Sequence, residues 1–193
     1  GYGNRPDQRH PASTLASLDA NTTFIQGTNT APVLDLDKTV VTPEDGGQVA
    51  LGIDAPTDSD SPALTIAVTG VPANGTIYMA DGTTVVSTAT VLSLTDLQGL
   101  KFTPGAVTAN TSDSFTYTVS DGFNAAVPGT VTLTVNDTLA TVNETITGGT
   151  GDDVLIGGAG NDQLTAGTGD DQLSGGLGDD SFIYQGGYDT FTG

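Results

Sequence analysis

Aspartate recurs at a fixed spacing of nine residues after residue 147. When the sequence is written in nines from Gly148, five units follow one another, and the sixth position of every unit is Asp. These position-six residues are Asp153, Asp162, Asp171, Asp180 and Asp189. Position four is Gly in all five units, and position eight is Leu or Phe. A carboxylate is a hard oxygen ligand, so the repeated column indicates binding of a hard cation.

The rest of each unit predicts how these carboxylates are positioned. The Gly-rich first six residues predict a tight turn, and the last three predict a short strand that sends one apolar side chain inward. Successive units are expected to alternate between two parallel sheets. The carboxylates of units one and three, two and four, and three and five then meet across stacked turns. Ca²⁺ takes about six to eight oxygens and suits such a pair with turn carbonyls, whereas Mg²⁺ demands octahedral geometry.

The array resembles the calcium-binding nonapeptide G-G-x-G-x-D-x-U-x of the repeats-in-toxin (RTX) family. Units 148–156, 157–165 and 175–183 carry the whole pattern. The third unit departs only at Ala166, and the last has Tyr184 and Gln185 in place of its Gly pair, which puts its half-site in doubt. The resemblance implies a right-handed parallel β-roll with about two or three calcium ions. It also implies type I export of an unfolded chain that folds on calcium outside the cell.

The expected ligands in the array are the five position-six carboxylates and the turn carbonyls, with Gly148, Gly157 and Gly175 at position one. The neighbouring residues Asp152, Asp170 and Asp179 at position five alternate away from the position-six direction. We therefore expect them to face solvent or to lie outside direct ligation.

Residues 31–137 alternate between apolar and polar types in short runs. Ser114–Val119 and Val131–Val135 alternate strictly, and Asn-Gly and Asp-Gly pairs separate such runs. Roughly seven to nine short strands predict an immunoglobulin-like β-sandwich. The region 93–99 is the one expected helical turn.

This region resembles the cadherin-like and VCBS-like modules of large bacterial adhesins. The residues that carry the resemblance are Ala31-Pro32-Val33, Pro43-Glu44-Asp45, Asp58-Ser59-Asp60, Pro72–Thr76 and Asp113–Gly122. In such modules acidic loops hold calcium, so the resemblance makes Glu44, Asp58, Asp60 and Asp121 candidate ligands. The alternative is that these residues only form turns.

Residues 1–30 are polar and irregular. They are either a flexible leader or an arm that adds a strand to a neighbouring sheet through Phe24 and Ile25, since these two have no obvious partners within the arm.

Composition excludes several classes of function. With 23 acidic and 4 basic residues, the net charge of −19 argues against nucleic acid and against an anionic membrane surface as partners. No run approaches the roughly 20 apolar residues of a membrane helix. Cys is absent, and the one His, His10, lies in the irregular leader. The folded region therefore has no thiol or imidazole for catalysis, and we expect no enzyme.

The sequence thus predicts an all-β chain: an arm at 1–30, a cadherin-like β-sandwich at 31–137 and a calcium-bound parallel β-roll at 138–193. The expected function is that of a secreted or cell-surface calcium-binding structural protein, such as an adhesin, matrix fibre or surface-layer component. Its expected partners are calcium, and cell-surface or matrix components or other copies of itself bound through the arm. The alternative is the C-terminal export and folding module of a larger secreted RTX enzyme or toxin, which an enzyme domain upstream would favour.

Overall fold

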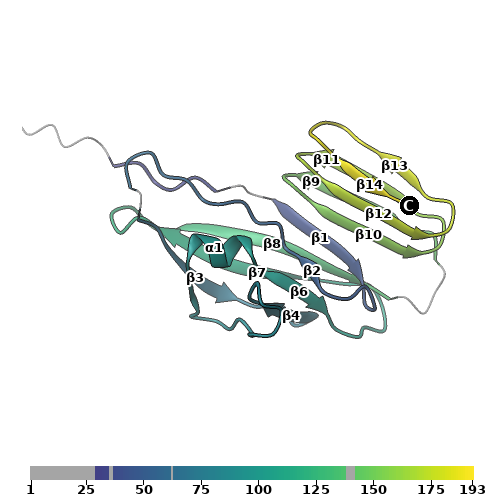
Figure 1. The fold of residues 1–193 in the computed structure, drawn as a ribbon, viewed down its shortest axis with the longest axis horizontal. Coiled ribbons are helices and arrows are strands. Elements are labelled where there is room, and N and C mark those ends of the chain that lie inside the picture. The colour runs from purple at the N-terminus through teal and green to yellow at the C-terminus, as the bar shows by residue number, and fades with distance from the viewer. Residues whose placement is uncertain (1–28, 35–36, 62, 138–141) are drawn as a thin grey trace, which may run out of the picture.

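The fold is a β-sandwich joined to a β-roll (Figure 1). The structure, a computed structural model, describes residues 29–193 except 35–36, 62 and 138–141. Its strands are β1 (Lys38–Pro43), β2 (Val49–Ala50), β3 (Thr65–Gly70), β4 (Gly75–Tyr78), β5 (Val91–Leu92), β6 (Lys101–Pro104), β7 (Thr111–Ser120), β8 (Val127–Asn136), β9 (Thr145–Thr150), β10 (Val154–Ala159), β11 (Gln163–Thr168), β12 (Gln172–Leu177), β13 (Ser181–Ile183) and β14 (Thr190–Thr192). The predicted all-β fold class is confirmed.

The sandwich is made from β1–β8. Strands β1, β8, β7, β3 and β5 lie side by side in one sheet, and β2, β6 and β4 form the other. The longest pair, β7 with β8, is antiparallel with Phe115 opposite Val131, as the alternating runs in the sequence require. The expected helical turn is present as α1 (Leu94–Gln98). It begins at Ser93, whose hydroxyl accepts from the Asp96 N–H while the Asp96 carboxylate accepts from the Ser93 N–H.

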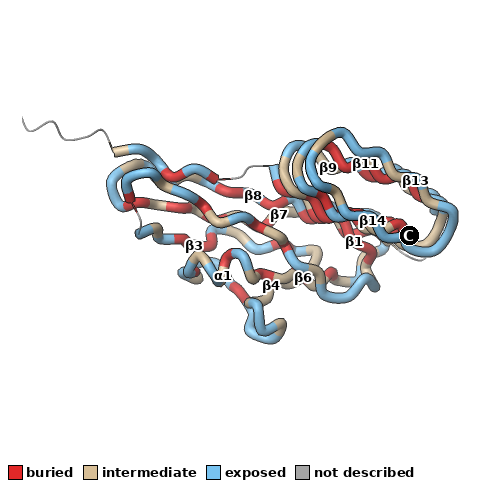
Figure 2. The backbone as a smooth tube through the Cα atoms, turned by 45° about the horizontal axis from the view of Figure 1, so that its top comes forward, coloured by how far each residue is buried: buried red, intermediate tan, exposed pale blue. Residues whose placement is uncertain are grey.

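The sandwich core lies between the two sheets, where buried stretches of the chain lie (Figure 2), and it contains the largest buried side chains among the described residues. Phe102 and Phe115 are fully buried, as are Leu97, Leu100 and Leu133. These residues come from the inward positions of strands with period two and from the single inward face of α1. The sandwich core is therefore built from hydrophobic side chains.

The roll is made from β9–β14, which alternate between two sheets as predicted. Strands β9, β11 and β13 pair in one sheet, and β10, β12 and β14 pair in the other, all in parallel. Paired residues are 18 apart, for example Thr145 with Gln163 and Val154 with Gln172, so each coil takes two units. The inward column of position eight, with Leu155, Leu164 and Leu173, fills a narrow core.

The strands of the roll differ from the predicted ones in length. A strand such as β10 has six residues and includes the first three positions of the following unit, so the turn is only the Gly-x-Asp of positions four to six. The Gly pair at positions one and two lies in the strand because neighbouring coils pass very close there. A Cβ on Gly167, whose φ is +106°, would collide with the backbone of Gly149.

The two parts share one sheet, which the sequence did not predict. Strand β1 pairs in parallel with β8 of the sandwich and with β10 of the roll, giving an eight-stranded sheet in the order β14-β12-β10-β1-β8-β7-β3-β5. Hydrogen bonding thus crosses the expected boundary at residues 137/138. The missed parallel pairing of β1 with β10 joins residues more than 100 positions apart and leaves no periodic signal in the sequence.

Candidate metal centre

The position-six aspartates line the two corners of the roll where its turns end. Asp153, Asp162 and Asp171 are 1%, 2% and 1% exposed. Each lies two residues before an inward apolar side chain, so strand alternation sends its carboxylate to the inside of the corner. Carboxylates this deeply buried require partners that compensate for lost hydration.

In each of three pairs, the carboxylate of the later coil accepts a hydrogen bond from the position-six residue of the preceding coil. Asp153, Asp162 and Asp171 donate their backbone N–H to an Oδ1 atom 18 residues later, at 2.8, 2.9 and 3.1 Å. The acceptors are Asp171, Asp180 and Asp189, respectively. The structure therefore brings together the three carboxylate pairs that the sequence predicted, including the one that involves the degenerate last unit.

The second carboxylate oxygen in these corners has no protein partner. The Oδ2 atoms of Asp153, Asp162 and Asp171 are buried and accept no hydrogen bond from the described residues. Because an unpaired buried carboxylate oxygen is costly, three of them in repeated positions fit a positively charged ligand.

The position-one glycines leave room beside these oxygens. A Cβ on Gly148 would fall closer than 3.0 Å to both Asp153 Oδ2 and the carbonyl oxygen of Ala166. A Cβ on Gly157 would meet Asp162 Oδ2 and the Gly175 carbonyl oxygen in the same way, and one on Gly175 would meet Asp180 Oδ2. A carboxylate and a backbone carbonyl thus converge on a small space, and this donor set fits Ca²⁺.

Burial makes these corners electrostatically costly without a cation. Desolvation by burial raises the pKa of Asp153 to about 6, and the charge of Asp171 adds to the increase. The Thr39 N–H and the charge of Lys38 oppose it. Burial and the charges of Asp189 and Asp152 likewise raise the pKa of Asp171. A bound divalent ion would remove this penalty because it favours the ionised carboxylates.

Position-five residues make a second column outside the corners. Asp170 donates its N–H to Asp152 Oδ1 at 2.6 Å, and Tyr188 donates its N–H to Asp170 Oδ1 at 2.9 Å. On the opposite edge, Asp179 donates to Asn161 Oδ1 at 2.9 Å. Asp170 and Asp179 are exposed and Asp152 is half-buried. The column caps backbone N–H groups between coils, and its residues point away from the buried oxygens.

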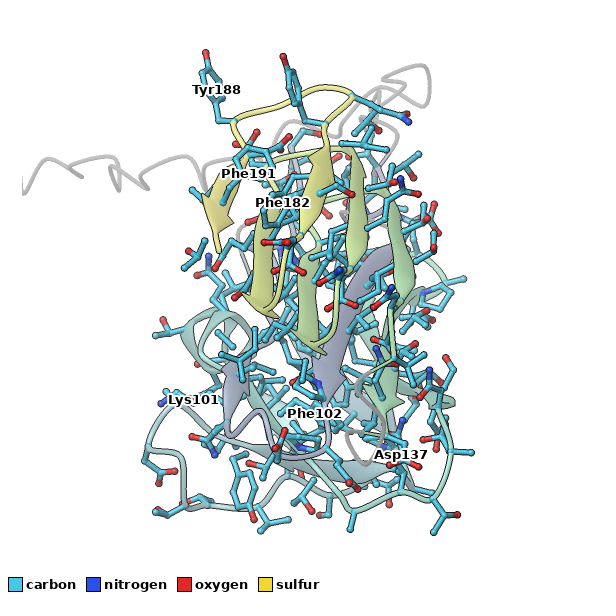
Figure 3. All side chains as sticks on the ribbon, turned by 90° about the vertical axis from the view of Figure 1, so that its right-hand side faces the viewer. Lys101, Phe102, Asp137, Phe182, Tyr188 and Phe191 are labelled. Carbon is cyan, nitrogen blue, oxygen red and sulfur yellow. The ribbon has the colours of Figure 1, made fainter. Side chains whose placement is uncertain are left out.

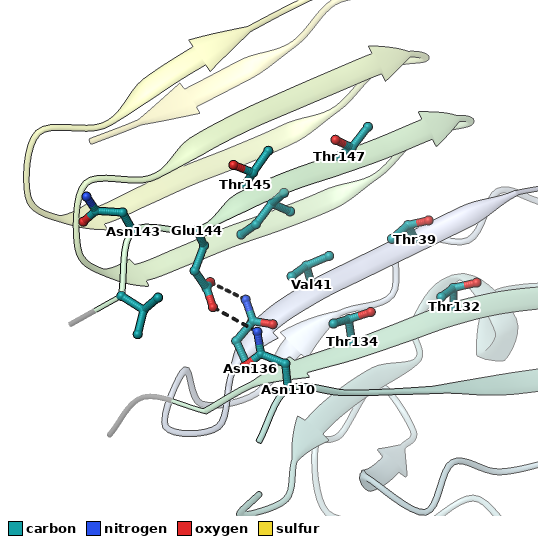
Figure 4. A pocket seen from close by; sticks show the side chains of 12 residues that line it. Thr39, Val41, Asn110, Thr132, Thr134, Asn136, Asn143, Glu144, Thr145 and Thr147 are labelled. Carbon is teal, nitrogen blue, oxygen red and sulfur yellow. Dashed lines mark hydrogen bonds between the residues drawn. The ribbon is translucent and has the colours of Figure 1, made fainter. Parts of the chain in front are cut away.

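Sequence reasoning missed Glu144, which occupies position six of a degenerate unit at 139–147. Its N–H donates to Asp162 Oδ1 at 2.8 Å, as a position-six residue does. Its longer side chain instead reaches the sandwich and accepts from the Nδ2 atoms of Asn110 and Asn136 (Figure 4). Burial raises its pKa. The sequence signal that could have revealed this unit is Ile146, which supplies the apolar residue of position eight.

The acidic residues singled out in the sandwich fall into two groups. Asp58, Asp60 and Asp121 gather where the described chain begins. Thr30 N donates to Asp60 Oδ2 at 2.9 Å, and Asn29 Nδ2 donates to Asp121 Oδ2 at 2.6 Å.

Turn hydrogen bonds occupy much of this group. Asp58 Oδ1 accepts from the N–H groups of Asp60 and Ser61, and Asp121 Oδ1 accepts from those of Phe123 and Asn124. The backbone hydrogen bond from Thr30 lowers the pKa of Asp60, and those from Phe123 and Asn124 lower the pKa of Asp121.

Glu44 does not join them: its Oε2 accepts from Val107 N at 2.7 Å, beside the far end of β1. Among the described residues, no three His, Cys, Asp or Glu side chains are grouped so as to hold a metal ion. The calcium ligands proposed for the sandwich therefore stay predictions. The corners of the roll would bind Ca²⁺ through carboxylate pairs and backbone carbonyls.

Comparison with protein families agrees with this geometry. Residues 29–134 match the model of a bacterial Ig domain, and residues 141–173 and 157–191 match that of the RTX calcium-binding nonapeptide repeat. The chain belongs to the bacterial Ig domain family and carries an RTX array. RTX nonapeptide repeats bind Ca²⁺, and the match from residue 141 includes Glu144. No curated protein matches the chain.

The two families also bear on the setting of this bacterial Ig and RTX protein. Both are typical of secreted or surface proteins of bacteria, and both are typically structural and not catalytic. Within the described part of the chain, no helix has the length and apolar character needed to cross a membrane.

Proposed function

We propose that this protein is a structural module of a secreted or cell-surface assembly, such as an adhesin, a matrix fibre or a surface layer, and that its roll folds on calcium after export. The observation that carries the proposal is the set of buried, unpartnered Oδ2 atoms in Asp153, Asp162 and Asp171. The cytosol holds little calcium, so these corners would stay open until the chain reaches the outside. Metal binding then supplies folding free energy.

Calcium titration of the full chain tests this proposal. We expect one ion for each stacked carboxylate pair, about three per chain, with a gain of β-structure by far-UV circular dichroism at millimolar calcium. Magnesium at the same concentration is the control and should produce little change. The variant Asp162→Asn should lose about one ion, because it removes the charge of one pair. A chain that gains neither ions nor β-structure in calcium would contradict the proposal.

The stoichiometry also tests the candidate ligands of the sandwich. Asp58, Asp60 and Asp121 lie at the end of the sandwich away from the roll, and we propose them as a weaker additional calcium site. A bound-ion count clearly above the number of corner pairs supports it, provided that Asp60→Asn lowers the count. Glu44 is tested by the matching variant Glu44→Gln.

We further propose that copies of this protein associate through residues 1–30. The supporting observation is the open edge of β9, which is the last described strand of its sheet. This edge borders a cleft of about 550 Å³ beside β1 and β8, with Val41, Thr134 and Ile146 among its lining residues (Figure 4). Since a strand residue in a packed sheet fills roughly 160 Å³, the cleft has room for three or four residues of an added strand.

The position of the arm favours association between copies. Asn124 Nδ2 donates to the Asn29 carbonyl, which places the described start of the chain near the beginning of β8. The lining of the cleft on β8 runs from Thr132 to Asn136, about 17 to 30 Å along this strand from Val127, whereas Phe24 can extend only about 17 Å from Asn29. The Phe24-Ile25 pair could therefore reach at most the near end of its own cleft, whereas it could fill the cleft of a neighbour. Such head-to-tail contacts build open filaments.

Deletion of residues 1–28 tests this association. The truncated protein should remain a folded monomer by circular dichroism and lose the polymers seen by light scattering. The substitution Phe24→Asp should have the same effect, with Thr23→Asp as the control on a residue of the opposite strand face. Polymers of unchanged size in the truncated protein would rule out the arm.

A further inference from the structure

Strand β1 of the sandwich lies in the roll where a preceding coil would be. Val40 and Val41 pair in parallel with Val154 and Leu155, in the same way that these residues pair with Gln172 and Leu173 of the next coil. This register places Thr39 at position six and Asp37 at position four of a repeat unit. The RTX pattern has Gly at position four and Asp at position six. Asp37 and Thr39 therefore do not match it, and the sequence does not indicate that β1 corresponds to a repeat unit.

The residues before β1 also reproduce the contacts of a repeat turn. Thr39 donates its N–H to Asp153 Oδ1 at 2.6 Å, which is the bond that Asp153 makes to Asp171 and Asp171 makes to Asp189. Asp37 has a positive φ, +69°, as the position-four glycines do, although in the first four units their φ is larger, +132° to +145°. The Asp37 carboxylate also accepts from Thr150 Oγ1 at 3.1 Å.

The two sides of β1 serve different cores. Val40 is fully buried in the sandwich core, and Val41, which is 5% exposed, packs in the core of the roll. Strand β10 does the same in reverse, since Val154 packs in the sandwich core and Leu155 in the roll. Each part therefore completes its core with a strand that belongs to the other, unlike modules that meet at an exposed linker.

We propose that β1 acts as the first strand of the roll and that it couples calcium binding in the roll to the folding stability of the sandwich. This inference rests on the proposed calcium function. An ion that fixes Asp153 also fixes the carboxylate that holds Thr39, and it orders β10, which closes one side of the sandwich core. Any ligand that binds only the folded unit stabilises all of it by mass action. The chain is then one calcium-linked unit in place of two modules in tandem.

The effect also runs from the sandwich to the roll. Because coupling between sites is reciprocal, a weaker sandwich lowers the apparent calcium affinity of the roll. Strand β1 already pairs with β10 and binds the Asp153 carboxylate at the first corner before any metal binds. Coils added after it then extend an existing edge, and they avoid the cost of nucleating a parallel sheet from distant segments.

Hydrogen exchange on the full, unaltered chain tests the coupling. Peptides from β9–β14 should exchange more slowly in saturating calcium than in a chelator, and so should peptides from β1 and β8. We expect protection of β8 by about tenfold or more, since the sandwich would share the free energy of ion binding. Protection limited to residues 145–192 would overturn the inference and leave the proposed calcium function intact. Absence of protection in the roll would overturn both.

A pair of adjacent valines provides a second, independent test. Val40→Ala enlarges only the sandwich core, and we expect it to raise the calcium concentration at half-saturation by roughly three- to fivefold. The matched control Val91→Ala changes a side chain that is 67% exposed and should leave this value unchanged. Val41→Ala should raise it as well, because Val41 lies in the core of the roll. A normal calcium titration for Val40→Ala together with a less stable sandwich would show independent modules.

Discussion

The sandwich and the roll bury opposite kinds of side chain in neighbouring cores. The sandwich buries two phenylalanines and many large aliphatic residues between its sheets. The roll core contains six buried apolar residues, none of them aromatic, and three aspartates are buried at the corners of the roll. Burial of apolar area stabilises the sandwich in any ionic condition, whereas the corners of the roll carry an electrostatic cost until a cation arrives. Two β-folds built from similar strands thus differ in what they need in order to fold.

The two ends of the roll differ as well. The first coil is covered by β1, but the last leaves aromatic residues near the surface (Figure 3). Phe182 and Phe191 contact edge to face with ring centroids 5.5 Å apart, and Phe191 is still 45% exposed, beside the 87% exposed Tyr188. Position eight therefore keeps its apolar type to the end of the array, although its side chains are progressively less buried.

Removal of calcium should separate the two regions most strongly. In a chelator we expect loss of β-structure from residues 145–192, because the charges of three buried aspartates then repel and lack counter-charge. The sandwich should stay folded with a lower melting temperature. Limited proteolysis with mass spectrometry would locate the new cuts. If β7 and β8 were cut before β11 or β12, the sandwich would be the region that depends more on calcium, which would contradict this prediction.

The position-one glycines offer a narrower way to disable the roll. Gly148→Ala places a methyl group between Asp153 Oδ2 and the Ala166 carbonyl, where a cation would bind. An overpacking cost of about 1–3 kcal/mol weakens calcium binding by roughly 5- to 150-fold. Isothermal titration calorimetry measures this change.

The adjacent residue provides the control for that substitution. Gly149→Ala adds the same methyl group where the nearest atom, Asp153 Oδ2, is 4.0 Å away, so it should bind calcium nearly normally. Equal losses in the two variants would mean that the space beside Gly148 is not a metal site.

Acidification should weaken the roll and leave the apolar sandwich core largely unaffected. Since the folded pKa of Asp153 is about 6, this carboxylate must lose a proton to bind calcium below that pH. One such proton lowers the calcium affinity about tenfold between pH 7 and pH 5. In the metal-free chain the sign is opposite: a raised carboxyl pKa contributes stability that is complete below about pH 4 and lost as the pH rises through 6.

Calcium titrations at several pH values check this prediction. Asp153→Asn should bind calcium more weakly at pH 7 and show a shallower pH dependence, since its amide does not titrate in this range. An unchanged slope in that variant would assign the proton to another group, such as Asp171, whose pKa is also raised.

The smallest expected effect concerns the third unit, which has Ala166 where the other full units have Gly. Ala166 is fully buried. Because its register is that of Gly148 at position one, its methyl group lies in the space beside the Asp171 carboxylate that Gly leaves free in the other full units. Ala166→Gly should therefore strengthen binding at that corner by a few-fold, and should cost the metal-free fold roughly 0.5–1 kcal/mol of backbone entropy. Ala159→Gly, at position three, is the control. A lower affinity in Ala166→Gly would show that the methyl group supports the corner by packing.

Much of the roll could be predicted because its information is periodic. One unit predicts the corner of every other unit, and a spacing of 18 residues follows from two units per coil. The predicted pairs of Asp153, Asp162 and Asp171 therefore appear in the structure. The sandwich was predictable as a class through strand alternation, but its acidic loops were not, since the same Asp that ligates a metal also forms a turn.

The sequence by itself determined the calcium chemistry, because nine-residue spacing and parallel pairing can only stack carboxylates on carboxylates. The tertiary structure alone decided where the array begins. Asp37 and Thr39 differ from the Gly and Asp that the repeat has at positions four and six, yet pairing of β1 with β10 places them at the register of a repeat turn. Glu144 keeps the position of a ligand while its side chain binds the sandwich. Backbone hydrogen bonds do not depend on side-chain identity, because every residue except Pro carries the same N–H and C=O groups. A strand more than 100 residues away can therefore complete the roll without leaving a motif.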